Sequence, residues 1–157
     1  MLVYLFRHGH ACGLGAGIAS DEERFLTQDG IAALEAAARK YVAELPRPER
    51  ILHSPFRRAR ETAEIVARCF EFDAALEATD KLLSEADPAA ILPELQAAAA
   101  SDPEAIALVG HEPHIGRLLG TLIADSRASV PMSPGMLAVV ELEGSTSLWG
   151  RLVMARS

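Results

Sequence analysis

The sequence predicts an α/β fold, a three-layer α/β/α sandwich around a largely parallel sheet. Short apolar runs of strand length alternate with longer segments whose apolar residues recur at helical spacing. The two clearest runs, residues 2–6 and 105–109, are apolar throughout, as expected of strands buried on both faces. The 157 residues contain no internal repeat and no low-complexity linker, so we expect one domain over residues 1–157.

The segment after the first strand predicts a loop and then a helix. Residues 11–20 are rich in glycine, but the glycine spacing fits neither the P-loop nor the dinucleotide-binding fingerprint. Thr27 has the side chain of a helix N-cap, and Asp29 suits the first turn of the following helix. Apolar residues at helical spacing extend this helix to about Glu44, and Pro46 follows it.

The middle of the chain predicts two further strands and two further helices. Residues 50–53 are expected to form a second short strand, and a helix is expected from Phe56 onwards. A weaker strand is expected at residues 75–79. Pro88 suits the first turn of a helix that runs towards Ala100.

The last third predicts a strand, a helix and a strand pair. After the buried run at residues 105–109, Glu112-Pro113 opens a helix with apolar residues along one side. Residues 136–142 and 148–154 alternate in polarity well enough to be strands. Gly144-Ser145 is expected to form the turn between them.

Charge and composition exclude several classes of function. A net charge of -7 argues against a nucleic acid or an anionic membrane as the main partner. No segment approaches the ~18 apolar residues of a membrane helix, and no signal peptide is evident, so we expect a cytoplasmic protein. Cys12 and Cys69 show neither metal-type spacing nor a disulfide framework, and no histidine pair has i, i+4 spacing, so no metal site is expected. The oligomeric state is left open.

Three polar stretches directly follow predicted strands: Arg7-His8-Gly9, residues 54–58, and Gly110-His111-Glu112. Ligands of open α/β sheets bind beyond the carboxyl ends of strands, so these stretches would share one crevice if their strands are neighbours. The planar fork of arginine binds phosphate oxygens in a bidentate way, and a neutral imidazole is a competent nucleophile towards phosphorus. The pattern therefore indicates phosphoryl chemistry that needs no metal ion or other cofactor.

These three stretches, together with Leu26-Thr27 and Gly30, resemble a known family in their order along the chain. They are similar to four motifs of the histidine phosphatase superfamily, which contains the phosphoglycerate mutases and acid phosphatases: Arg7-His8-Gly9; Leu26-Thr27 with Gly30; Ser54-Pro55-Phe56-Arg57-Arg58-Ala59 with Thr62-Ala63; and Gly110-His111. The short chain and the run from Val109 to Pro113 resemble the small SixA-type phosphohistidine phosphatases. The resemblance covers nearly the whole chain and implies a phosphoglycerate mutase-like fold.

The resemblance also implies roles for residues of the crevice. His8 matches the nucleophile that becomes phosphorylated, and Arg7 matches the arginine that holds the phosphoryl oxygens. Arg58 matches the second phosphate-binding arginine, whereas Arg57 fits an exposed helix face. His111 matches the second histidine, which stabilises the transferring group.

The sequence does not decide which residue would act as the general acid. Glu85 is the nearest match to a glutamate that larger relatives use. Asp21 and Arg24 lie in a segment that resembles the region before Leu-Thr in SixA-type proteins, where an acid and another phosphate contact could arise. His53 is either a residue of the crevice or a plain strand-end histidine. The imidazole of phosphohistidine needs less help from an acid than an alkoxide does.

We therefore expect a cofactor-independent phosphatase that works through phospho-His8. The leading substrate is phosphohistidine on a protein of the histidine-phosphotransfer type, since the chain lacks the insertion that carries substrate-specific elements in larger relatives. One alternative is a phosphomonoesterase for a small metabolite, with a small phosphate ester in the same site. Another is an inactive phosphate-binding module. A phosphoglycerate mutase is disfavoured because the chain lacks length for further substrate-enclosing segments.

Overall fold

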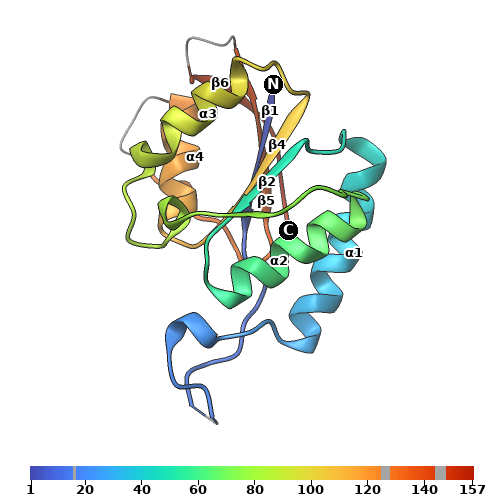
Figure 1. Cartoon of the computed structure of the whole chain (residues 1–157), viewed down its shortest axis with the longest axis vertical. Coiled ribbons are helices and arrows are strands. Elements are labelled where there is room, and N and C mark those ends of the chain that lie inside the picture. Colours follow the sequence, from blue (N-terminus) through green and yellow to red (C-terminus); the bar gives the residue numbers. More distant parts are fainter. Residues whose placement is uncertain (16, 125–127, 144–147) are drawn as a thin grey trace.

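The computed structural model describes residues 1–15, 17–124, 128–143 and 148–157 (Figure 1). Within these ranges one six-stranded sheet has the strand order β3-β2-β4-β1-β5-β6. The first four strands in this order run parallel, and β5 and β6 are antiparallel to their neighbours. The strands are β1 (Leu2–Arg7), β2 (Arg50–His53), β3 (Glu77–Ala78), β4 (Ala105–Gly110), β5 (Leu137–Leu142) and β6 (Gly150–Arg156).

Helices cover both faces of the sheet, which confirms the predicted fold class (Figure 1). Helices α1 (Gln28–Glu44) and α2 (Arg57–Cys69) lie on one face, and α3 (Leu92–Ala99) and α4 (His114–Ala124) lie on the other. Val3 and Leu5 of β1 belong to the core on the α3–α4 side, and Tyr4 and Phe6 belong to the core on the α1–α2 side. Because successive side chains of a strand point to opposite faces, a strand between two helical layers must be apolar throughout.

The predicted start of α1 is confirmed. The side-chain oxygen of Thr27 accepts a hydrogen bond from the Gly30 N–H at 3.0 Å, as an N-cap residue does. A Cβ atom on Gly30 would collide with the carbonyl oxygen of His10, so only glycine fits at this position. The first turn of α1 thereby packs directly against the chain that leaves β1.

Several element boundaries differ from the prediction. The strand expected at residues 75–79 is reduced to two residues, which pair with the end of the four-residue β2. The helix expected from Pro88 begins as a 3-10 helix over Pro88–Ile91, and the α-helix follows from Leu92. Pro93 explains this break, because it lacks the N–H that a continuous α-helix would donate to the carbonyl of residue 89.

The carboxyl-terminal strand also differs from the prediction. β6 runs from Gly150 to Arg156, about two residues later than the expected segment. The turn expected at Gly144-Ser145 falls outside the described residues. Over the described ranges, none of the helices combines the length and the apolar character needed to cross a bilayer.

Candidate active site

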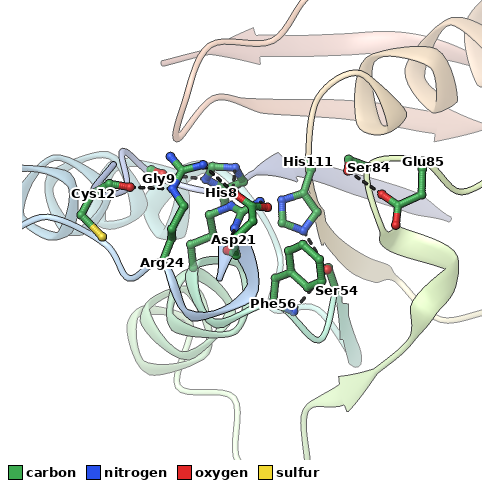
Figure 2. Close-up of polar contacts among 11 residues, drawn as sticks. His8, Gly9, Cys12, Asp21, Arg24, Ser54, Phe56, Ser84, Glu85 and His111 are labelled. Atoms are coloured by element: carbon green, nitrogen blue, oxygen red, sulfur yellow. Dashed lines mark hydrogen bonds and ion pairs between the residues drawn. The ribbon is translucent and has the colours of Figure 1, made fainter. Parts of the chain in front are cut away.

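The sheet brings the three predicted polar stretches to one edge. Strands β1, β4 and β2 are parallel neighbours, and Arg7 at the end of β1 pairs with Gly110 at the end of β4. His8, Ser54 and His111 each follow one of these strands directly. Their side chains lie together in Figure 2.

His8 is buried and has one ring nitrogen free of a proton. Its Nδ1 lies 2.8 Å from the carbonyl oxygen of Gly9, which can only accept a hydrogen bond, so Nδ1 carries the proton. Its Nε2 accepts a hydrogen bond from Nε of Arg58 at 3.2 Å. Burial and the nearby arginine charges lower the pKa of His8 to about 4. At neutral pH the ring is therefore neutral, with a lone pair on Nε2.

Arg58 links the nucleophile candidate to Asp21. The Arg58 side chain is only 5% exposed, and its Nη1 donates to the backbone oxygen of Asp21 at 2.6 Å. Its Nη2 donates to the Asp21 carboxylate at 2.8 Å. The ring of Phe56 lies under the guanidinium group, with 5.1 Å between the ring centroid and Cζ. Arg58 is thus held by contacts on several sides.

Arg24 lies on the same loop as Asp21 and completes this arrangement. Its Nη1 donates to the other carboxylate oxygen of Asp21 at 2.8 Å, and its Nε donates to the carbonyl of Cys12 at 2.6 Å. The charge of Arg24 also contributes to the lowered pKa of His8. The segment after the glycine-rich loop therefore brings a second guanidinium group near His8, and one carboxylate lies between Arg24 and Arg58.

His111 lies beside His8, with 5.0 Å between the ring centroids. It is 1% exposed, its Nε2 lies 2.7 Å from Oγ of Ser54, and Phe56 packs edge-on against its ring. Burial, followed by the charges of His8 and Arg58, lowers the pKa of His111 to about 3, so this ring is also neutral at neutral pH.

Arg7 leaves the end of β1 towards the loop before β5. Its Nη1 donates to the carbonyl of Met132 at 2.6 Å, and the Glu112 carboxylate accepts from the Met132 N–H at 2.9 Å. The Nε of Arg7 is buried and has no hydrogen-bond partner among the described residues. A buried donor without a partner is costly, so this N–H is a candidate contact for a bound anion.

The structure places the two acid candidates differently. Burial raises the pKa of Asp21, but hydrogen bonds from Arg24 and Arg58 outweigh burial and hold its pKa below the ordinary value. Glu85 is fully exposed, and the hydrogen bond from Ser84 lowers its pKa. Figure 2 shows Glu85 beyond His111, on the side away from His8. Both carboxyl groups are therefore ionised at neutral pH.

The remaining candidates lie around this centre. Arg57 is half exposed and pairs with Glu61 at 2.7 Å on the outer face of α2, as expected for a helix surface residue. His53 is buried, and its Nδ1 donates to the carbonyl oxygen of Ser54 at 2.8 Å, so it braces the turn after β2. Among the described residues, no group of three or more His, Cys, Asp or Glu side chains could hold a metal ion.

Ser54 and Phe56 are the contacts of His111 that sequence reasoning missed. Both belong to the Ser54–Ala59 motif, but the motif gave a role only to its arginine. The available signal was the position of Ser54, a serine directly after a strand whose neighbour is followed directly by a histidine. The hydrogen bond itself depends on the register between β2 and β4 and cannot be read from either segment alone.

Comparison with known proteins decides the family. The family model of the histidine phosphatase superfamily (branch 1) matches residues 3–88, more than half of the chain. The chain belongs to this superfamily. This membership and the similarity to SixA phosphatases identify it as a phosphatase, with the mixed sheet and helical layers of the phosphoglycerate mutase-like fold.

Individual relatives of this histidine phosphatase point to one branch of the family. Phosphohistidine phosphatase SixA of Escherichia coli (strain K12) is 30% identical over 122 residues, which cover 78% of this chain and 74% of that protein. The structure of the protein histidine phosphatase SixA complexed with tungstate matches with a TM-score of 0.90 at 29% identity, covering 100% of this chain and 97% of that chain. A protein assigned as SixA from Agrobacterium tumefaciens matches with a TM-score of 0.80 at 26% identity, covering 99% and 97% of the two chains.

The pKa of His8 gives a first testable prediction for this histidine phosphatase. We expect the His8 ring to titrate near pH 4, well below the value of about 6.5 for an unfolded histidine. Between these two values the unfolded chain binds more protons, so the free energy of unfolding falls as the pH is lowered through this window and is restored above about pH 6.5. NMR titration of the ring gives the pKa, and urea unfolding at about pH 7 and about pH 4.5 gives the stability. A His8 midpoint at about 6 or above would contradict the burial argument.

Proposed function

We propose that this phosphatase hydrolyses phosphohistidine on a protein in the cytoplasm, through a covalent intermediate on His8. The observation that carries the covalent step is the hydrogen bond from Nδ1 of His8 to the Gly9 carbonyl. It fixes the proton on Nδ1, so that Nε2 is a nucleophile without prior deprotonation. The neutral second ring of His111 lies 5.0 Å away, close enough to contact a group transferred to His8.

The two proposed steps follow from this arrangement. First, the Nε2 lone pair of His8 forms a bond to phosphorus, and the bond from phosphorus to the substrate imidazole breaks with its electron pair on that imidazole. A proton that the substrate ring has taken from water on its other nitrogen makes the leaving group a neutral imidazole. Second, water attacks phospho-His8, the P–N bond breaks, and inorganic phosphate, a proton and free His8 result.

Arginine side chains supply the positive charge for these steps. Arg58 and Arg7 would hold the phosphoryl oxygens, and Arg24 is placed to add a further contact. The Asp21 carboxylate pairs with Arg58 in this structure, so a bound phosphoryl group would take the place of that carboxylate on Arg58. The similar SixA structure is complexed with tungstate, a tetrahedral oxyanion, which supports an oxyanion site in this chain as well.

The ionised state of the two acid candidates supports phosphohistidine as the substrate. A general acid must hold a proton at working pH, but the pKa values of Asp21 and Glu85 are both lowered. An alkoxide leaving group needs such an acid, whereas an imidazole leaves without one. The similarity to SixA, a phosphohistidine phosphatase, supports the same substrate class.

A groove beside the site supports a protein as the carrier of the phosphohistidine. It has a volume of about 350 Å³ and lies between the glycine-rich loop and the start of α2. Phe25, Pro55 and Arg60 are among the residues that line it. Pro55 directly precedes Phe56, which contacts both His111 and Arg58, so the groove lies beside a residue that packs against the site. Residues that flank a phosphorylated histidine could occupy it.

Hydrolysis of a phosphohistidine protein, measured beside a panel of phosphomonoesters without added metal, tests the proposed substrate. We expect kcat/KM to favour phosphohistidine by about 100-fold or more, because a positioned acid is worth at least that much to an alkoxide leaving group. A preference for one phosphomonoester would contradict the protein substrate and would favour a metabolite phosphatase that still uses His8. Turnover of neither class would contradict both substrate assignments.

Two variants serve as controls for the acid argument in that experiment. Asp21→Asn and Glu85→Gln each remove one carboxyl group near the site. A variant that slows phosphomonoester hydrolysis by about 10-fold or more and spares phosphohistidine hydrolysis would identify that residue as an acid for esters, and would contradict the argument that both carboxyl groups are ionised. An equal loss on phosphohistidine would contradict the proposal that the imidazole leaves without a protein acid.

A further inference from the structure

We propose that Ser54 is a positioning residue that fixes the proton of His111 on Nδ1, so that Nδ1–H faces the transferring phosphoryl group. The last part of this inference rests on the proposed function. The position of the proton is a property of the resting enzyme and can be measured without any substrate.

The hydroxyl group of Ser54 has a defined donor role. Ser54 is 0% exposed, and its Oγ lies 2.7 Å from Nε2 of His111. The same oxygen is within 3.4 Å of the Phe56 backbone N–H, which can only donate to it. Among the described residues, Nε2 of His111 is then the acceptor left for the hydroxyl hydrogen. A ring nitrogen that accepts a hydrogen bond carries no proton, so in the neutral ring the proton lies on Nδ1.

The Nδ1 atom of His111 is the atom left for a ligand. It is buried and has no hydrogen-bond partner in the described part of the chain. Figure 2 shows it on the side of the ring that faces Asp21, the carboxylate bound to Arg58. A phosphoryl oxygen bound to Arg58 in place of that carboxylate would meet an N–H donor at Nδ1. The opposite tautomer would present a lone pair to the same oxygen and repel it.

The backbone around Ser54 is held firmly enough for this role. Its N–H donates to the carbonyl of Val109 at 3.0 Å, and its own carbonyl accepts from Nδ1 of His53 at 2.8 Å. The hydroxyl position is therefore set by β4 on one side and by the His53 ring on the other. This assigns His53 a structural task in the same arrangement: it braces the turn that carries Ser54.

Two-bond ¹H–¹⁵N spectra of the histidine rings at neutral pH test the tautomer. We expect the wild-type His111 to show a protonated Nδ1 and an unprotonated Nε2. In Ser54→Ala the proton should move towards Nε2, the nitrogen that free histidine prefers to protonate. We also expect kcat on phosphohistidine to fall by about 100-fold with little change in KM, the lower end of the effect of losing one oriented donor. Ser101→Ala, at an exposed serine after α3, should change neither readout.

Each outcome bears on a different claim. A wild-type His111 protonated on Nε2 would overturn the inference whatever the activity, and this result does not require any variant to fold. An Nδ1 proton that persists in a folded Ser54→Ala would also overturn it, because another group would then fix the tautomer. Ser54→Thr keeps the hydroxyl group and should restore the wild-type spectrum. A wild-type enzyme with the expected tautomer and no activity on phosphohistidine would contradict the proposed function and leave the role of Ser54 in fixing the tautomer intact.

Discussion

Replacement of His8 by alanine should abolish turnover, with a fall in kcat of about 10⁴-fold or more, the order of effect expected when an enzyme loses its nucleophile. The variant lacks the lone pair that Arg58 and the Gly9 carbonyl orient in the wild-type enzyme. Phosphate release from phosphohistidine measures the loss. Mass spectrometry after an alkaline quench, in which phosphohistidine is stable, should detect phosphate on the wild-type chain and none on the variant.

His10→Ala is the matched control for the His8 variant. His10 lies two residues further along the same loop and is exposed, with its Nδ1 within 3.3 Å of the Thr27 hydroxyl. We expect its activity to stay close to that of the wild type. Appreciable turnover by a folded His8→Ala would contradict the covalent mechanism. If wild-type turnover is lost in His8→Ala while phosphohistidine still binds, the protein is an enzyme that uses His8. An inactive binding module would show no turnover in either form.

The strands at the centre of the sheet could be predicted because a short, continuous apolar run in the sequence indicates a strand that is buried on both faces. The run Leu2–Phe6 is apolar on both faces, and it forms a strand between two helical layers. The carboxyl ends of parallel neighbours meet by geometry, so the sequence predicts that His8 and His111 meet if their strands are adjacent, and β1 and β4 are adjacent. The order of the strands was not needed in detail. It was enough that β1 and β4 are adjacent.

The contacts that depend on a loop path could not be predicted. After β1, Ala11 and Leu26 pair in an isolated antiparallel bridge outside the named strands, so the segment between them forms a loop whose two ends meet. This path carries Asp21 back onto Arg58, where the carboxylate and the backbone oxygen of Asp21 both accept hydrogen bonds. No local pattern encodes that meeting, since the residues are 37 positions apart and lie in different elements. The boundary of α3 was missed for a local reason, because the effect of Pro93 was overlooked.

The Arg58→Ala variant should lose about 10³-fold or more in kcat/KM, the order of effect expected when a preorganised cation at a phosphoryl site is removed. Arg58 is 5% exposed and donates to His8 and to Asp21, so the variant removes the charge and also leaves His8 Nε2 without its donor. Arg58→Lys should not restore activity, because an ammonium group lacks the planar fork that binds two oxygens at once. Tungstate affinity measures the loss of anion binding in the absence of turnover.

The adjacent Arg57 makes this prediction specific. Arg57→Ala also removes one arginine charge, at the neighbouring residue. The Arg57 side chain lies on the outer face of α2, where it pairs with Glu61 and stacks over the ring of Phe25. Measured on a small phosphoramidate, which does not extend into the groove beside Phe25, Arg57→Ala should keep nearly full activity. The pKa of His8 adds an independent readout: the positive charge of Arg58 contributes to its lowering, so the pKa should rise in Arg58→Ala. Equal losses in the two variants would mean that only the net charge of the helix start matters, and would contradict a bidentate oxyanion site built on Arg58.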